Sequence, residues 1–182
     1  MKPVRPSLAR HLARLTREQQ GISSVEFAML LPLMLTLYLG AVEISQAVGI
    51  DRKVTLTSRT VADLASQVTS ISNNDMSNLL NASSSVIAPY DASKLKVTVS
   101  EVSVDANGNA TVTWSDTLGG TARAVGSSVA LPAALSIANT SVIWGEASYN
   151  YRPAIGWVIT GTLQMYDQIF LRPRQSTSVT HT

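Results

Sequence analysis

The sequence predicts an α+β protein with a long N-terminal helix packed on a small antiparallel sheet of about four strands. Two observations support this. A long apolar stretch continues into residues with helical periodicity, and the second half alternates apolar and polar residues between turn sequences. The 182 residues suit one ordinary domain, and the charged fraction of 14% lies below the roughly 25% of an average soluble domain. This composition argues against a disordered chain and against a nucleic-acid-binding protein.

The N-terminus has the charge pattern of a membrane-targeting segment. The first 20 residues hold five basic residues and one acidic residue, whereas the rest of the chain holds nine basic and eleven acidic residues. No charge occurs from Phe27 to Val42, and as a helix the wider stretch 22–50 exceeds the ~30 Å hydrocarbon core. Because the basic residues precede the apolar stretch, we expect a cytoplasmic N-terminus and an exported C-terminal part. The predicted organisation is a leader 1–21, a transmembrane or assembly helix 22–50, its amphipathic continuation 51–72 and an exported α+β domain 73–182.

Three kinds of targeting segment fit this start, and Glu26 favours one of them. A secretory signal would be cut after its apolar core, near Ala41–Ala47, and a mitochondrial transit peptide would not normally run straight into a span. The third is a signal cut before the apolar segment. A carboxylate in hydrocarbon costs about 2.5–3.5 kcal/mol, so Glu26 is expected to have a partner, such as the mature N-terminal amine of a neighbouring chain. The alternative is that Glu26 marks the cytoplasmic edge of the span and snorkels.

Two further features of the apolar helix concern its packing. Pro32 removes one backbone hydrogen bond and can kink the helix. Ala41, Ser45 and Gly49 recur every four residues, a spacing that would let another helix approach closely, although such residues are also ordinary in transmembrane helices.

This region resembles the N-terminal segment of the TadE-like proteins, which are pseudopilins of the Tad (tight adherence, Flp) pilus. The residues that match are Gly21, Val25-Glu26-Phe27-Ala28, Leu31-Pro32-Leu33 and Gly40-Ala41-Val42-Glu43, with weaker matches at Tyr149-x-Tyr151-x-Pro153 and Leu171-Arg172-Pro173-Arg174.

The resemblance implies a minor pilin with a role in pilus assembly and surface adherence. It implies cleavage between Gly21 and Ile22 by a prepilin peptidase, and a role in processing or subunit registration for Glu26, followed by Phe27. The implied partners are that peptidase, other pilins of the same pilus, an inner-membrane assembly platform and membrane lipid. The implied location is the bacterial inner membrane with a periplasmic C-terminal domain, or the outside of the cell once the pilus is assembled.

Beyond the span, an apolar stripe predicts that the helix continues to about Ser70. Its members are Val54, Val61, Leu64, Val68 and Ile71. The sequence Asn73-Asn74-Asp75 predicts a new start, with Asn74 or Asp75 as the cap of a short helix that ends before Pro89.

The remaining segments predict four antiparallel strands. Leu95–Val104 contains a phase slip that predicts a β-bulge near Ser100-Glu101, and a hairpin turn at 105–109 leads into a strand with Ala110, Val112 and Trp114. A loop at 118–140, with one helical turn near 130–135, precedes strands at 141–152 and 162–172, and the polar tail 175–182 is expected to be frayed.

The chemistry of an enzyme or metal site is missing from the sequence. There is no cysteine, and the two histidines are His11 and His181, so no thiol site, histidine triad or multi-histidine metal site can be built. The alternating oxygens of Asp105, Asn107 and Asn109 lack the glycine and glutamate spacing of a calcium loop. We therefore expect a structural protein without cofactor or metal. An uncleaved signal-anchored binding or adhesion protein is the first alternative, a secreted binding protein the second and an enzyme the third.

Overall fold

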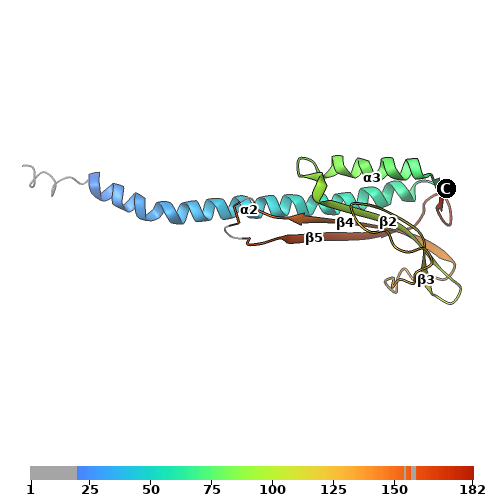
Figure 1. Ribbon diagram of the computed structural model, residues 1–182. Helices are drawn as coiled ribbons and strands as arrows, with labels where there is room; N and C mark the ends of the chain where they lie inside the picture. Colours follow the sequence, from blue (N-terminus) through green and yellow to red (C-terminus); the bar gives the residue numbers. More distant parts are fainter. Residues whose placement is uncertain (1–19, 154, 157–158) are drawn as a thin grey trace, which may run out of the picture. The chain divides into compact units, whose positions relative to one another are not determined.

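The computed structural model describes residues 20–153, 155–156 and 159–182. The predicted leader, apart from its last two residues, and His11 therefore lie outside the described residues. The chain divides into two compact units, Met1–Val42 and Glu43–Thr182. The boundary falls before residue 50, where the sequence predicted that the transmembrane or assembly helix ends. The element order is α2 (Gln20–Ser66), β1 (Ser70–Ile71), α3 (Asn73–Ile87), the 3₁₀ turn η1 (Ala92–Lys94), β2 (Leu95–Val104), β3 (Ala110–Leu118), β4 (Thr140–Tyr151), β5 (Leu163–Leu171) and β6 (Thr180–His181). Figure 1 labels α2, α3 and strands β2 to β5.

The C-terminal part of α2 packs on the sheet through a face made mostly of small residues. From residue 47 onward its buried members are Ala47, Ile50, Val54, Thr57, Ser58, Val61, Ala62, Ala65 and Ser66. A Cβ placed on Gly145 of β4 would come within 2.7 Å of both Ala62 Cβ and the Ser58 carbonyl oxygen, so helix and strand approach closely here. This explains a failed prediction: Leu64 is 43% exposed, because the contact has room for alanine and serine but not for a leucine.

The helix ends at Ser66, earlier than predicted, and the next helix starts with a different cap. Ser72 is the N-cap of α3, and its hydroxyl oxygen accepts a hydrogen bond from the Asp75 amide at 3.2 Å. Asp75, which the sequence suggested as a cap, is the third helical residue and completes a capping box with its carboxylate. The predicted end before Pro89 is confirmed, since α3 finishes at Ile87.

The four predicted strands are present and form one antiparallel sheet in the order β3-β2-β4-β5. The hairpin between β2 and β3 is held by Asp105, whose Oδ1 accepts hydrogen bonds from the amides of Asn107 and Asn109, each at 2.8 Å. Gly108 supplies the positive φ of +86° that this turn needs. The Asp105 carboxylate therefore serves the turn itself.

The predicted bulge exists, but its extra residue belongs to β3. Glu101 pairs with Trp114 and Val102 pairs with Val112, which leaves Thr113 without a partner in the ladder. The pairing of β2 with β4 continues without a shift. The bulge does not explain why the apolar positions of β2 change from odd to even numbers. They change because each face of the sheet has its own core.

The two cores share the sheet. Val97, Val99, Ile143 and Ala147 face α2 and α3, which lie on the same side of the sheet (Figure 1), whereas Val102, Val104, Ala110, Val112 and Val142 form a smaller core on the opposite face. Because of the bulge, Trp114 joins the first core and Val112 the second. The second core is covered by Val129 and Leu131, so part of the segment predicted as a loop has a packing role.

The C-terminal segment contradicts its prediction, because it is packed and not frayed. Val179 is fully buried, its amide donates to Glu101 Oε1 at 2.7 Å, and its carbonyl accepts from Trp114 Nε1 at 2.7 Å. Strand β6 then pairs in parallel with β1. Two buried side chains, those of Glu101 and Trp114, therefore gain hydrogen-bond partners from this segment.

Candidate functional site

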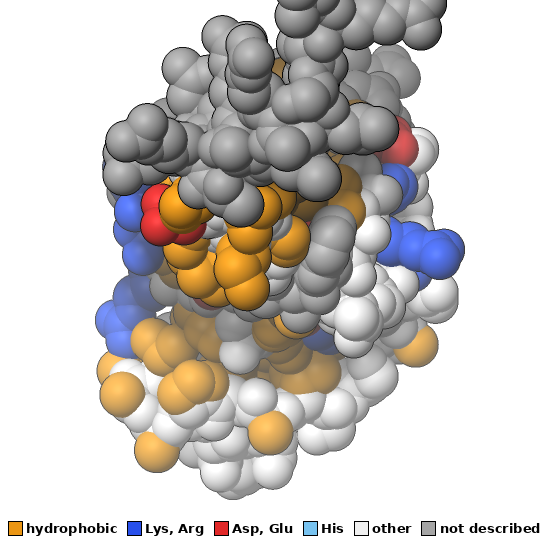
Figure 2. Space-filling model, turned by 90° about the vertical axis from the view of Figure 1, so that its left-hand side faces the viewer, with side chains coloured by type: hydrophobic (Ala, Val, Ile, Leu, Met, Phe, Trp, Pro, Cys, Tyr) orange, Lys and Arg blue, Asp and Glu red, His pale blue; other side chains and the backbone are white. Residues whose placement is uncertain are grey.

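The first candidate site is the apolar N-terminal part of α2. Within the first unit, most of its large hydrophobic side chains are exposed to at least 39% of their surface, whereas Leu39 and Val42 are half-buried. The exposed ones are Ile22, Val25, Phe27, Met29, Leu30, Leu31, Leu33, Met34, Leu35, Leu37 and Tyr38. The helix is long and apolar enough to cross a membrane by length and composition. Figure 2 shows hydrophobic side chains gathered on the described surface of this view, with Lys and Arg side chains beside them. So much exposed apolar surface on one segment indicates contact with lipid or with other proteins.

The residues predicted for processing lie at the start of this helix. Gly21 has nothing within 4 Å of the position that a Cβ would occupy, and Ile22 is 60% exposed. Glu26 and Phe27 are also exposed. Helical spacing places Glu26 just over one turn beyond Gly21. Among the described residues, none covers the bond between Gly21 and Ile22.

Pro32 lies inside a helix that continues through it. Because proline has no amide hydrogen, the carbonyl of Ala28 loses its usual helical partner. One turn later the Thr36 hydroxyl donates to the Pro32 carbonyl at 2.8 Å. The predicted loss of a backbone hydrogen bond at Pro32 therefore does not end the helix.

The three small residues predicted for helix packing have different surroundings. Ala41 and Ser45 are exposed. At Gly49, a Cβ would lie 2.4 Å from the hydroxyl oxygen of Tyr90, so this glycine already has a close neighbour from its own chain. Gly49 is thus needed for packing within the second unit, which leaves Ala41 and Ser45 as the open members of the row.

Glu43, the second glutamate of the motif, is buried in the second unit. Only 3% of it is exposed, and its Oε2 accepts a hydrogen bond from the Ile159 amide at 3.2 Å. Burial and the nearby Glu43 carboxylate raise the pKa of the Tyr151 phenol, which donates to Gln46 Oε1 at 3.4 Å. Sequence reasoning placed Glu43 at the end of the apolar stretch and in the family motif, and gave it no contact within the fold. Its structural role depends on a loop more than a hundred residues away, for which the sequence carries no local signal.

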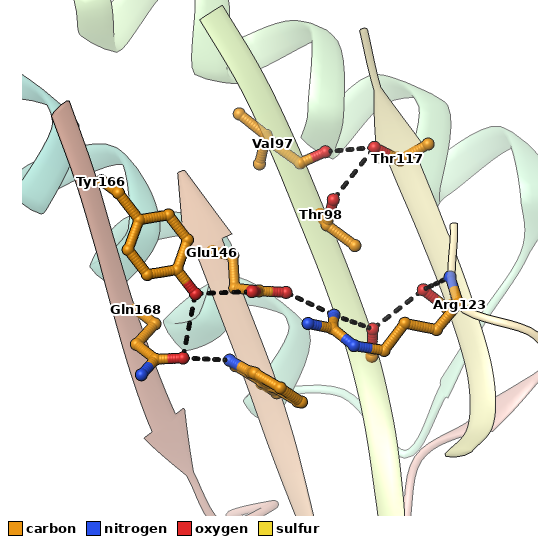
Figure 3. Close-up of polar contacts among 10 residues, drawn as sticks. Val97, Thr98, Thr117, Arg123, Glu146, Tyr166 and Gln168 are labelled. Atoms are coloured by element: carbon orange, nitrogen blue, oxygen red, sulfur yellow. Dashed lines mark hydrogen bonds and ion pairs between the residues drawn. The ribbon is translucent and has the colours of Figure 1, made fainter. Parts of the chain in front are cut away.

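The second candidate site is a polar network on the outer face of the sheet (Figure 3). Arg123 forms an ion pair with Glu146 and lies over the Trp144 ring, 3.6 Å from its centroid. The Tyr166 hydroxyl donates to Glu146 Oε1 at 2.7 Å, and Trp144 Nε1 donates to Gln168 Oε1 at 3.1 Å.

This network holds strands together and has no reactive group. Burial and the Glu146 carboxylate raise the pKa of Tyr166, so the phenol stays neutral. A cavity of about 330 Å³ beside it is lined mainly by hydroxyl, glycine and lysine residues. Among the residues that the structure describes, no group of three or more His, Cys, Asp or Glu side chains could hold a metal ion.

Comparison with known proteins finds a similarity at the first site. The family model described as TadE-like protein matches residues 21–63, which include the exposed apolar part of α2 and its buried continuation. No curated protein and no solved structure gives a match to the chain. The resemblance predicted from Gly21, Glu26 and Pro32 is confirmed over this segment, where the chain is similar to the TadE-like family.

Proposed function

We propose that this TadE-like chain is a minor pilin of a Tad-type pilus, a structural subunit with a role in pilus assembly and surface adherence. In this proposal a prepilin peptidase cleaves it after Gly21. The mature helix then anchors the protein in the inner membrane and later packs among other pilins. The observation that carries the proposal is the segment of exposed apolar residues in α2, which lies within the match to the TadE-like family.

The length of the segment supports an anchor that can also enter a filament. The second compact unit begins at Glu43, so Ile22 to Val42 is the part of the helix outside it. At 1.5 Å per residue this is about 32 Å, close to the ~30 Å hydrocarbon core. The segment needs no residue of the second unit to cross a membrane.

Glu26 is the proposed point of registration between subunits. Cleavage at Gly21 would create a charged amine on Ile22, and both this amine and the Glu26 carboxylate are costly in an apolar environment unless they are paired. Pairing the amine of one subunit with Glu26 of the next would satisfy both. It would also set the stagger of head-to-tail assembly, the type of contact that grows helical filaments.

This proposal assigns location and partners as well. The leader stays in the cytoplasm and the second unit faces the periplasm until assembly carries the subunit outward. The partners are the prepilin peptidase, other pilins of the same pilus, the inner-membrane assembly platform and lipid.

The first test is the N-terminal sequence of the membrane-bound protein. A start at Ile22 is the expected result. A start at Met1 would favour the uncleaved signal-anchored binding protein instead, and a start beyond Val42 would favour a secreted protein.

The second test compares the two glutamates of the motif. Glu26→Ala should leave the thermal unfolding of the second unit unchanged and stop incorporation into filaments, measured by immunoblot of sheared pili. Glu43→Gln is the contrasting variant: it weakens the acceptor of the half-buried Ile159 amide, so it should lower the unfolding temperature. Wild-type incorporation of the Glu26→Ala protein would rule out the proposed role of this carboxylate.

A further inference from the structure

The two edges of the sheet differ in how their backbone groups are used. Strand β3 is covered by the segment after it: Val112 donates to the Ser127 carbonyl at 3.0 Å and accepts from the Gly126 amide at 2.8 Å, while Val129 donates to the Ala110 carbonyl. Strand β5 forms the other edge. Within the described part of the chain, no backbone hydrogen bond reaches the outer side of β5.

The register shows which residues of β5 present this open edge. The amide and carbonyl of Val112 form their hydrogen bonds on the side away from β2, so Val112 and its partner Val102 are not bonded to each other. The amide and carbonyl of Val102 therefore point toward β4. The same alternation holds across the β2–β4 and β4–β5 pairs, so the backbone groups of the odd-numbered residues of β5 point toward β4. The open groups are therefore those of Gln164, Tyr166, Gln168 and Phe170.

A side-chain contact agrees with this assignment. The Gln168 amide donates to the carboxylate of its neighbour Asp167 at 2.8 Å, which a residue bonded to β4 could not do. Protecting an edge amide with a local carboxylate is a way to discourage uncontrolled strand pairing. It leaves the other amides of the edge available.

Two grooves run beside this edge, between β5 and α2. The first, of about 360 Å³, is lined by Ala47, Val48, Asp51 and residues 163–166. The second, of about 290 Å³, is lined by Arg59, Thr60, Asp63, Ile169, Leu171 and Arg174. When a strand is added to a sheet, its backbone provides affinity, and pockets that receive alternate side chains provide specificity. The β5 edge has both the free backbone groups and the pockets that such a site needs.

The charges indicate what kind of strand fits. Asp63 in the second groove is paired with Arg174. Asp51 in the first groove and Asp167 on the strand have no ion pair with a basic side chain of the described residues. An added strand with a Lys or Arg near these carboxylates, and apolar side chains two residues to either side, complements both charge and grooves.

A second copy of this chain fits less well. Its own β3 edge is already covered, and centred antiparallel pairing of β5 with β5 would bring two Asp167 carboxylates opposite each other. Like charges directly opposite destabilise a strand pair.

We propose that the open edge of β5 receives an extended segment of a different pilin subunit, with a basic residue between apolar ones at alternate positions. This rests on the proposed function, which supplies the class of partner. The contact would join the exported domains of two subunits, in addition to the packing of their helices.

The test uses the full-length chain in cells that assemble the pilus. A photo-crosslinking amino acid replaces Val48, which lines the first groove and is 46% exposed, and the crosslinked peptide is identified by mass spectrometry. Leu64, with a similar exposure of 43% and outside both grooves, is the control position. The crosslinker is then combined with Gln164→Pro, which removes an outward amide that an edge strand can spare, or with the matched Gln164→Ala.

The expected product at Val48 joins the chain to a segment of another pilin that has the stated alternation. Gln164→Pro should reduce it by roughly tenfold and Gln164→Ala by far less, since only proline blocks the backbone bond. Equal yields in the two variants, or a product with a second copy of this chain, would overturn the inference. Tryptophan-fluorescence melting checks that the proline variant is folded. If it is not, Asp167→Lys replaces it, with Asp167→Asn as its control, and the same loss is expected from the lysine variant alone.

The readouts separate this inference from the proposed function. Filaments that contain the Gln164→Pro chain with its leader removed, and an undiminished Val48 product, would refute only the contact at β5. Absence of the wild-type chain from filaments would refute the function first.

Discussion

Gly145→Ala should separate α2 from the sheet, because this glycine is where the two approach most closely. The added Cβ would lie 2.7 Å from Ala62 Cβ and 2.7 Å from the Ser58 carbonyl oxygen, and 3.3 Å from the Ala62 amide nitrogen. Carbon atoms in contact are about 3.5–4.0 Å apart, so the helix must move by nearly 1 Å. Backbone atoms make up most of the obstacle and cannot rotate away. We expect a loss of about 2–3 kcal/mol in the unfolding free energy, at the upper end for overpacked cores.

The assay is urea unfolding of the full-length protein in detergent, followed by tryptophan fluorescence. Gly120→Ala is the milder comparison, because its Cβ would meet side-chain hydroxyls and no backbone atom: Thr117 at 2.8 Å and Thr98 at 3.8 Å. The Thr117 side chain can turn away at the cost of its hydrogen bond to the Val97 carbonyl. Adding Ala62→Gly to Gly145→Ala should recover part of the loss and so reveal coupling between the two sites. If Gly145→Ala unfolds within about 0.5 kcal/mol of wild type, the close contact of helix and strand is refuted.

The remaining predictions concern the buried C-terminal segment. Burial raises the pKa of Glu101 above its ordinary value of 4.5, so the folded state holds the proton more tightly than the unfolded state. Wild-type stability should therefore fall as the pH rises from 4.5 through the folded-state pKa, and Glu101→Gln should flatten this change and be more stable at neutral pH, as urea titrations across that range can show. An equally steep fall in the glutamine variant would contradict this. Trp114→Phe removes the donor to the Val179 carbonyl, which should cost about 1–3 kcal/mol and speed tryptic cleavage after Arg174, followed by mass spectrometry; unchanged cleavage would show that the indole does not hold the segment.

Local patterns in the sequence account for most of the elements and for the first candidate site. The hairpin at 105–109 depends on turn residues that are adjacent in the chain, and the end of α3 before Pro89 depends on the backbone of proline itself. The apolar segment before Glu43 needs no tertiary contact to be apolar, so its exposure and its resemblance to TadE-like proteins could both be anticipated.

The second candidate site could not be anticipated in the same way. Arg123 lies in a segment that looks like an ordinary polar loop, and it reaches Glu146 and Trp144 only because that segment folds back over the sheet. The edge and grooves beside β5 likewise depend on strand order, which a pattern of alternation does not specify.

Helical and strand periodicity are properties of neighbouring residues. The set of elements, and an apolar helix suited to a membrane or a filament, could therefore be predicted from the sequence. The tertiary structure alone decided that Leu64 points outward, that Thr113 forms the bulge and that the polar C-terminal segment is buried. The physical reason is distance along the chain. Val179 is buried by bonds to Glu101 and Trp114, residues 78 and 65 positions away, and the composition of the segment around Val179 does not contain that information.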